Sequence, residues 1–481
     1  MFPTVTVDIG TTSVKLCCFD ASGALVASDS RATPTVGDAV GEIYDVAELQ
    51  RRIVVFVGSL TGDARRSIRR VAITGVGESG GLVRPDLSLA SPMIHWHDQR
   101  GRGYIDGLSA SERARIYAVT GLPANANYGL SKLAWAYHQP GTDAADAVWL
   151  NIAEYLAAWM SGLRWSEYSL ASRTMALDLT TRAWSDEVCG YFDVPASAFG
   201  EMRPATEGAV VCGSVARELG ISPEVRVHVA GHDHMVGAAA ADLQPGELLN
   251  STGTTEGLLF LRGAPSLDDE TAGAKLANGM SPTGDAYTLF ASIPTGGSAF
   301  ATLQGLLGLD AVALTARVER VHERYLHGAF DVRSLPVVLP RFRGSPPPDK
   351  DPSARGAIAG LGSDTTLDEL ILASFLGMVL QFRDVLGLFP QTATGVKVIG
   401  PASRNPLWLQ LKADLLGVEL SVSGFPEVVS RGAQHLASDV RGDWVMSEPF
   451  AVSPHGGRHA DLEDWSVHVA PRWNALKDMP S

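Results

Sequence analysis

Two short segments rich in glycine and threonine offer the first chemistry in this chain. The first is Asp8, Ile9, Gly10, Thr11, Thr12 and Ser13, and a similar one, Ser251, Thr252, Gly253, Thr254, Thr255 and Glu256, opens the second half. Each lies between two apolar, β-branched runs, so we expect a tight turn between strands. Backbone N–H groups and hydroxyls in such turns bind anions. Two such turns predict a duplicated scaffold that holds a phosphate chain between its copies.

The two segments differ in one acidic residue. In the first, Asp8 can hold Mg²⁺ through water while Gly10, Thr11, Thr12 and Ser13 contact phosphates, and Lys15 can add a positive charge. In the second, Ser251 stands where Asp8 stands, so Gly253, Thr254 and Thr255 are expected to contribute only N–H groups and hydroxyls. An ordinary hairpin explains either segment equally well when it is considered alone.

Asp233 lies between two histidines just after an apolar strand-like run. A carboxylate in that place suits a general base that removes a proton from a substrate hydroxyl. His232 and His234 also allow a metal site, since imidazoles are common zinc ligands. His95 and His97 form a second pair with the same spacing. The pattern alone therefore leaves a general base and a metal site open, and also plain structural histidines.

Other nucleotide-binding motifs are disfavoured. Residues 75–80 match GxGxxG, but the residues that follow include Pro85 and a turn instead of the start of a helix. The chain contains no GxxxxGK[ST] sequence, so a P-loop kinase is also disfavoured. Near residues 94–100, Trp96, Asp98 and Arg100 form a combination that binds sugars, with an apolar ring face beside charged hydrogen-bonding groups. A core tryptophan beside an ion pair is the structural alternative.

Taken together, the motifs resemble those of the FGGY carbohydrate kinases, the group of xylulokinase, glycerol kinase and fuculokinase. Seven segments match in sequence order along nearly the whole chain: residues 8–13, 94–100, 171–174, 231–233, 253–255, 351–356 and 403–408. The resemblance implies an α/β fold of two actin-like (ribonuclease-H-like) domains, with mixed sheets flanked by helices and the active site in the interdomain cleft. We place these domains at residues 1–244 and 245–481.

The resemblance also implies site residues and cofactors. ATP and Mg²⁺ would be the cofactors, with Asp233 as the catalytic base and Asp8 and Asp233 at the metal. The sugar or polyol would contact Glu78, Trp96, Asp98, Arg100, Arg173, His232 and Asp233. The nucleotide would contact the two glycine-threonine turns with Lys15, and also Gly400, Ala402 and Asn405.

The chain departs from the family pattern in two places. Gly400-Pro401-Ala402 replaces the usual three glycines, which implies a looser or different approach of the nucleotide. Glu78 and its neighbours replace a Gln-Met-His-Gly run of xylulokinases, so a fuculokinase-like branch fits better. Two other functions stay open: a metal-dependent hydrolase that uses His95, His97, His232 and His234, and a non-catalytic nucleotide or sugar sensor, which Pro401 and Ala402 would favour.

Composition narrows the partners. The formal charge is −14, which argues against nucleic acid as a partner. The apolar runs are too short to span a bilayer, and the N-terminus does not resemble a signal peptide. Cys17, Cys18, Cys189 and Cys212 show no metal-binding spacing and are interpreted as reduced thiols. We therefore expect a cytoplasmic protein with a small sugar or polyol as its partner, no nucleic acid and no membrane, and a homodimer as a candidate assembly.

The elements that position these residues can also be predicted. Residues 4–9, 14–19 and 24–29 predict three antiparallel strands, and Asp45 is expected to cap a helix. Buried strands are expected at 71–74, 93–96 and 225–230, and helices at 130–138, 147–161 and 211–219. Thr366 and Glu369 form a capping box for a long apolar helix at 366–389. Residues 241–245 are predicted as the domain junction, and 344–356 as a surface loop.

Overall fold

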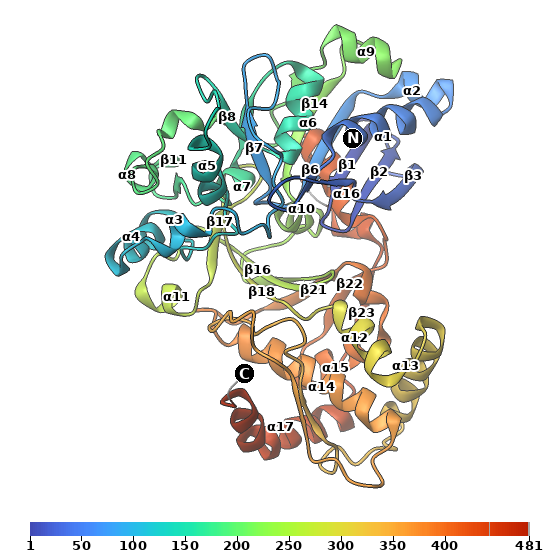
Figure 1. Cartoon of the computed structure of the whole chain (residues 1–481). Helices are drawn as coiled ribbons and strands as arrows, with labels where there is room; N and C mark the ends of the chain where they lie inside the picture. Colours follow the sequence, from blue (N-terminus) through green and yellow to red (C-terminus); the bar gives the residue numbers. More distant parts are fainter. Residues whose placement is uncertain (442, 480–481) are drawn as a thin grey trace.

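The computed structural model describes residues 1–441 and 443–479 and contains two large sheets, one from each half of the chain (Figure 1). The first has the order β13-β14-β6-β1-β2-β3. Its strands are β1 (Thr4–Ile9), β2 (Ser13–Phe19), β3 (Leu25–Ala32), β6 (Arg70–Gly75), β13 (Ala209–Val210) and β14 (Arg226–His232). The second has the order β17-β18-β16-β15-β21-β22-β23. Its strands are β15 (Glu247–Thr252), β16 (Glu256–Arg262), β17 (Ala277–Met280), β18 (Tyr287–Ile293), β21 (Gly395–Ile399), β22 (Leu420–Ser423) and β23 (Pro449–Val452).

The predicted duplication is present in the strand topology. In the first sheet, β1 pairs antiparallel with β2 and parallel with β6, and β6 pairs parallel with β14. In the second sheet, β15 pairs antiparallel with β16 and parallel with β21, and β21 pairs parallel with β22. Both glycine-threonine segments therefore join the central antiparallel pair of their sheet. The fold class predicted from the sequence, mixed sheets with flanking helices, is confirmed.

Helices cover both sheets. Those of the first half are α1 (Val46–Ser59), α2 (Gly62–Ser67), α3 (Arg102–Asp106), α4 (Ala110–Thr120), α5 (Gly129–Tyr137), α6 (Ile152–Ser161), α7 (Tyr168–Ala171), α8 (Asp186–Gly190), α9 (Gly213–Leu219) and α10 (Asp233–Ala240). Those of the second half are α11 (Asp269–Gly273), α12 (Ser298–Leu307), α13 (Ala311–Leu326), α14 (Leu367–Leu386), α15 (Pro406–Leu416), α16 (Val428–Ala437) and α17 (Gly456–Lys477). Asp45 caps α1, and Thr366 with Glu369 forms the predicted capping box of α14.

Short elements complete the chain. Small two-stranded sheets pair β4 (Thr35–Gly37) with β5 (Glu42–Tyr44), β7 (Gly80–Val83) with β8 (Val148–Asn151), β9 (Trp165–Glu167) with β12 (Glu201–Arg203), β10 (Leu177–Asp178) with β11 (Ala183–Trp184), and β19 (Val337–Leu339) with β20 (Ala357–Ala359). The described residues also form the 3₁₀ helices η1 (Ala196–Ala198), η2 (Pro401–Arg404) and η3 (Trp444–Ser447).

Three expectations from the sequence need correction. Residues 93–96 form no strand, because only Ile94 makes bridges, to Ile43 and Gly80. The segment 147–161 is not one helix, since its first residues form β8 before Asn151 caps α6. The loop at 344–356 is partly inside the protein, where Ser345 is only 2% exposed. In each case the contacts with distant segments decide the structure, and these are invisible in a local pattern.

One helix of the second half belongs to the packing of the first sheet. Helix α16 contacts β1, β6 and β14, and it lies among the blue strands of the upper part of Figure 1. Arg431 donates to the carbonyl of Gly23 at 2.7 Å, and Gln434 donates to that of Asp20 at 2.8 Å. Helix α16 packs in turn against α10, which follows Asp233. The two halves of the chain are thus joined by this pair of helices.

Within the described ranges, no single helix has the length and apolarity needed to cross a membrane. Only the bent pair Ser298–Leu307 and Ala311–Leu326, at 101° to each other, reaches those values jointly.

Candidate active site

Parallel strands of the first sheet bring the predicted catalytic residues to one edge. The register pairs Ile9 with Gly75 and Gly75 with His232, so β1, β6 and β14 end side by side. Asp8 lies near the end of β1, Glu78 follows β6, and Asp233 follows β14. Asp8 and Asp233 are near enough for their charges to interact. The sheet therefore gathers three carboxylates that are far apart in the sequence.

The first hairpin is a closed turn with an exposed tip. The N–H of Gly10 donates to the carbonyl of Ser13 at 2.9 Å, and Thr11 and Thr12 are exposed. A Cβ atom at Gly10 would lie 2.9 Å from that same carbonyl oxygen, so the turn requires glycine. Lys15 forms an ion pair with Glu427 at 3.0 Å, so its charge is already partly neutralised by the second half of the chain.

The second hairpin is supported by a loop that the sequence did not single out. The carbonyl of Gly253 accepts from the N–H of Gly297 at 2.9 Å, and the carbonyl of Thr254 accepts from Ser298 at 3.2 Å. Gly400, with φ of +101°, would place a Cβ atom 2.7 Å from the carbonyl oxygen of Thr252. The turn at 253–255, the loop at 296–298 and the Gly400 segment therefore lie together.

The departures near Gly400 fit this geometry. Pro401 is at the first position of η2, where a missing N–H removes no helical hydrogen bond. The Cβ of Ala402 lies 3.8 Å from the position of a Cβ atom built on Gly297, which is an ordinary contact. Asn405 caps α15, and its side chain accepts from Trp408 at 3.1 Å. Gly400 and Ala402 are thus beside the second hairpin, whereas the oxygen of Asn405 is used within its own helix.

Asp233 has two differently placed carboxylate oxygens. Its Oδ1 accepts the backbone N–H of His234 at 2.7 Å and lies 3.2 Å from Nε2 of His232. No donor in the part of the chain that the structure describes reaches Oδ2 in a hydrogen bond. Burial, opposed in part by the N–H of His234, raises the pKa of Asp233 to about 7. Burial and the charge of Asp233 likewise raise the pKa of Asp8 to about 7.

The two histidines beside Asp233 are locked by other side chains. His232 places Nδ1 3.0 Å from Sδ of Met235, and His234 places Nδ1 2.8 Å from Oγ of Ser251. Burial lowers the pKa of His232 well below its usual range and that of His234 to about 4, so both imidazoles are neutral. His232, Asp233 and His234 are the one group of possible metal ligands found among the described residues. His95 and His97 are outside it, which leaves a four-histidine hydrolase without structural support.

Arg173 and Glu78 form a buried ion pair beside the edge of the first sheet where β1, β6 and β14 end. Nη2 of Arg173 lies 2.7 Å from Oε1 of Glu78, and the guanidinium faces the rings of Tyr128 and Phe290. Nη1 of Arg173 is buried and has no hydrogen-bond partner among the residues that the structure describes. A buried donor without a partner costs free energy, so this atom is well placed to bind a ligand oxygen. Tyr128 and Phe290 were not predicted, because nothing in the sequence pattern distinguishes them from core aromatics.

In the predicted sugar segment, Arg100 is paired with protein carboxylates, whereas Trp96 is not part of an ion pair. The side chain of Arg100 is fully buried and donates to Asp98 at 2.8 Å and to Asp38 at 2.9 Å. The guanidinium of Arg100 thus donates to carboxylates of the protein itself, and it also stacks on Trp135. Trp96 donates from Nε1 to Oγ1 of Thr11 at 2.9 Å, which links this segment to the first hairpin. Trp96 is therefore better placed for a ligand than Arg100.

Two lysines that the sequence analysis missed have charges close enough to interact with Glu78. Lys132 in α5 is buried and donates to the carbonyls of Ala126 and Asn127, and burial lowers its pKa to about 7. Burial and the charge of Arg173 lower the pKa of Lys350 to about 8. Lys132 could have been found from the sequence, because a lysine among the apolar residues of a buried helix is unusual. Lys350 gave no such signal, since it belongs to the loop predicted to lie on the surface.

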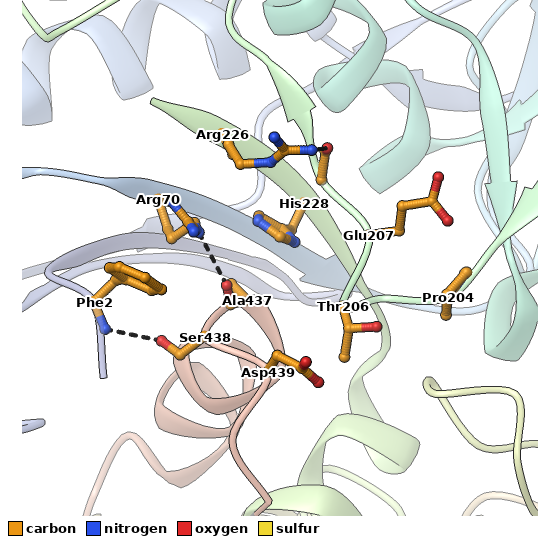
Figure 2. A pocket seen from close by; sticks show the side chains of 11 residues that line it. Phe2, Arg70, Pro204, Thr206, Glu207, Arg226, His228, Ala437, Ser438 and Asp439 are labelled. Carbon is orange, nitrogen blue, oxygen red and sulfur yellow. Dashed lines mark hydrogen bonds between the residues drawn. The ribbon is translucent and has the colours of Figure 1, made fainter. Parts of the chain in front are cut away.

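A cavity of about 360 Å³ lies at the opposite end of the same strands (Figure 2). Arg70 at the start of β6 and Arg226 and His228 at the start of β14 line it, with Asp439 after α16. Figure 2 shows Arg70 bonded to the carbonyl of Ala437 at the end of α16. None of the predicted site residues lines this cavity, which lies where α16 packs on the first sheet.

Known proteins resemble this chain over nearly its whole length. The family model described as "FGGY family of carbohydrate kinases, N-terminal domain" matches residues 4–240, and that of the C-terminal domain matches residues 248–438. The glycerol kinase of Pseudarthrobacter chlorophenolicus is 27% identical over 473 residues, which cover 92% of this chain and 90% of that protein. The glycerol kinase of Clavibacter michiganensis is also 27% identical and covers 92% of this chain and 89% of its own length.

Solved structures share the fold. Ligand-bound xylulose kinase from Lactobacillus acidophilus has a TM-score of 0.85 at 18% identity, covering 99% of both chains. Plasmodium falciparum glycerol kinase with ADP has a TM-score of 0.83 at 19% identity, covering 98% of both chains.

Proposed function

The chain belongs to the FGGY family of carbohydrate kinases, and we propose that it transfers the γ-phosphoryl group of ATP to a hydroxyl of a small sugar or polyol, with Asp233 as general base. It is a phosphotransferase with an alcohol acceptor, as its family is. The observation that carries the proposal is the place of Asp233, at the shared edge of β1, β6 and β14, beside Glu78 and Arg173.

Asp233 would act through Oδ2. The N–H of His234 fixes Oδ1, so the carboxylate is oriented and its second oxygen can accept the proton of the acceptor hydroxyl. As that proton leaves, the hydroxyl oxygen attacks the γ-phosphorus and the bond to the ADP oxygen breaks. Arg173 Nη1 and the indole of Trp96 would orient the acceptor, while Arg100 would hold Asp98 in place.

The two hairpins would hold the nucleotide. Exposed Thr11 and Thr12 offer hydroxyls from the first turn, and Gly253 and Thr254 are exposed at the second. Lys15 would act as part of the ion pair with Glu427, and Gly400 and Ala402 would line the approach of the nucleotide. The ADP in the glycerol kinase of similar fold supports ATP as the donor.

The carboxylates fit the Mg²⁺ that such a kinase needs. Burial and the charge of Asp233 raise the pKa of Asp8, and the carboxylate of Asp8 accepts no hydrogen bond from another described residue. Carboxylate oxygens are the ligands that Mg²⁺ prefers. When bound, the ion would neutralise charge on the phosphates. Asp8 would hold it directly or through water.

An acceptor screen tests the proposal. ADP release from Mg-ATP is measured with glycerol, xylulose, fuculose, gluconate and a set of other ketoses and polyols, with the acceptor-free rate subtracted. We expect at least one acceptor to raise the rate well above this background. Glycerol is the first acceptor to test, because the curated relatives are named glycerol kinases. Tight ATP binding without turnover of any acceptor would favour a sensor. A cytoplasmic location and a homodimer stay predictions from the sequence.

A further inference from the structure

We propose that His232, Asp233 and His234 form a zinc-binding site, and that Zn²⁺ bound there inhibits phosphoryl transfer by occupying the carboxylate of Asp233. The inhibition rests on the proposed function of Asp233, whereas the binding of zinc does not.

The three ligand atoms lie at suitable distances. Nε2 of His232, an oxygen of Asp233 and Nε2 of His234 can all lie within 4.8 Å of one another. Oδ1 of Asp233 is 3.2 Å from the first nitrogen and 4.0 Å from the second. Ligand atoms around a tetrahedral zinc ion are about 3.3 Å apart, given zinc–ligand distances of about 2.0–2.2 Å. Small side-chain rotations therefore suffice, and the three ligands leave a fourth position for water or an acceptor oxygen.

The ring nitrogens that face Asp233 are the ones that a cation would use. Nδ1 of His232 contacts Sδ of Met235 at 3.0 Å, and the other ring nitrogen, Nε2, faces Oδ1 of Asp233 at 3.2 Å. The contact with Met235 fixes the orientation of the ring. A metal ion would bind Nε2 in the tautomer that carries its proton on Nδ1.

Contacts with neighbouring side chains also fix the ring of His234. Its Nδ1 contacts Oγ of Ser251 at 2.8 Å, and its ring packs on Phe290 with a centroid distance of 4.9 Å. A Cβ atom at Gly257 would lie 2.5 Å from Oγ of Ser251, so glycine keeps this contact open. Histidines that bind metals typically use the other ring nitrogen in such a hydrogen bond, which fixes the ring. His234 has this arrangement with Ser251, whereas Nδ1 of His232 lies against the sulfur of Met235.

The ligand set selects against Mg²⁺. Imidazole nitrogens suit zinc, whereas Mg²⁺ prefers oxygen ligands. The Mg²⁺ that accompanies ATP would therefore leave the histidines free. A zinc ion bound to Asp233 would lower the basicity of the carboxylate, whose free oxygen Oδ2 must accept the hydroxyl proton, and would place a cation beside the oxygen that the acceptor hydroxyl approaches. Zinc is thus expected to compete with the acceptor.

Zinc binding is measured on the metal-free full-length protein, without nucleotide or acceptor. Calorimetry with ZnCl₂ is expected to give one site per chain, and Co²⁺ is expected to give visible absorption bands typical of tetrahedral coordination. His234→Asn keeps an amide near Ser251 but removes the distal nitrogen, so zinc affinity should fall sharply. Ser251→Ala keeps all three ligands and should weaken binding about 10–100-fold. His468→Asn, which changes an exposed histidine on α17, should bind zinc as the natural protein does.

Inhibition is measured with the best acceptor and excess Mg-ATP, with free zinc fixed by a metal buffer. We expect an apparent inhibition constant that rises with acceptor concentration, and a lower sensitivity to zinc in His234→Asn relative to its own uninhibited rate. Equal zinc affinity in His234→Asn and the natural protein would overturn the site, and zinc that binds without inhibiting would overturn its role. If no acceptor is phosphorylated, the proposed function fails while the binding data still decide the zinc site.

Discussion

At the scale of single residues, Asp233 has one engaged carboxylate oxygen and one available oxygen. Its surroundings raise its pKa to about 7, and a protonated carboxyl cannot accept the proton of the acceptor hydroxyl. We therefore expect kcat/KM for the acceptor to fall about tenfold per pH unit below pH 7 and to level off above it. Initial rates between pH 5 and 9 test this. A flat profile from pH 5 to 8 would contradict the assignment.

The same pKa can be checked without catalysis. The unfolded chain releases this proton near the ordinary value of 3.8, whereas the folded protein holds it up to about pH 7. Between these values the folded state binds more protons, so the contribution of Asp233 to stability falls as pH rises. Asp233→Asn removes this dependence. Its stability relative to the natural protein, measured by denaturant unfolding, should therefore increase from pH 4 to pH 7 and then stay constant.

Asp8 is a second prediction at this scale. Asp8→Asn keeps the shape of the residue but removes the charge that we place near Mg²⁺. If Asp8 acts through bound water, the Mg²⁺ concentration for half-maximal rate should rise about 10–100-fold. The rate is titrated with MgCl₂ at constant ATP, and Asp63→Asn serves as control because its side chain is 96% exposed. An unchanged Mg²⁺ requirement in Asp8→Asn would remove Asp8 from the metal site.

At the scale of elements, the second hairpin is anchored by a buried ion pair. Glu256 at the start of β16 and Lys412 in α15 form a salt bridge in which each side chain is 1% exposed. Lys412→Met leaves the carboxylate of Glu256 buried without its partner, so we expect a loss of about 3–5 kcal/mol in the free energy of unfolding. Arg102→Met breaks an exposed pair with Asp106 and should cost at most about 1 kcal/mol.

Urea unfolding of both variants measures the difference. The double variant Lys412→Met, Glu256→Leu should recover much of the loss, because replacing a buried ion pair by apolar groups is often close to neutral. Equal destabilisation by Lys412→Met and Arg102→Met would show that the pair does not anchor the hairpin.

At the scale of the whole molecule, the packing of α10 on α16 joins the two halves. A Cβ atom at Gly432 in α16 would lie 2.6 Å from the carbonyl oxygen of Val236 in α10. Gly432→Ala should therefore push the helices apart, with a loss of about 1–3 kcal/mol in stability and a lower kcat, since α10 begins at Asp233. Gly305→Ala in α12 meets open space and should stabilise by about 0.5–1 kcal/mol. Thermal unfolding and initial rates of both variants decide this, and a neutral Gly432→Ala would contradict it.

Local patterns predicted much of this architecture. The first hairpin, the cap at Asp45 and the capping box of α14 depend on residues near one another in sequence, so their signals are strong. Contacts between segments that are far apart in the sequence could not be predicted from local patterns. The link from His234 to Ser251 and the position of Phe290 beside Arg173 require the two halves to be placed in space. Residues 93–96 looked like a strand because an apolar run has the same pattern whether or not it finds a partner.

Phosphorylation of the acceptor by Asp233→Asn is the most direct test of the whole mechanism. The acceptor found in the screen is incubated with Mg-ATP and either the natural protein or the variant, and the phosphorylated product is quantified by mass spectrometry. Asp233→Asn preserves the shape of the side chain and the hydrogen bond from His234, so the variant should stay folded and bind ATP as the natural protein does, while the rate falls about 10²–10⁴-fold. Phosphoryl transfer at the natural rate by this variant would show that Asp233 is not the general base.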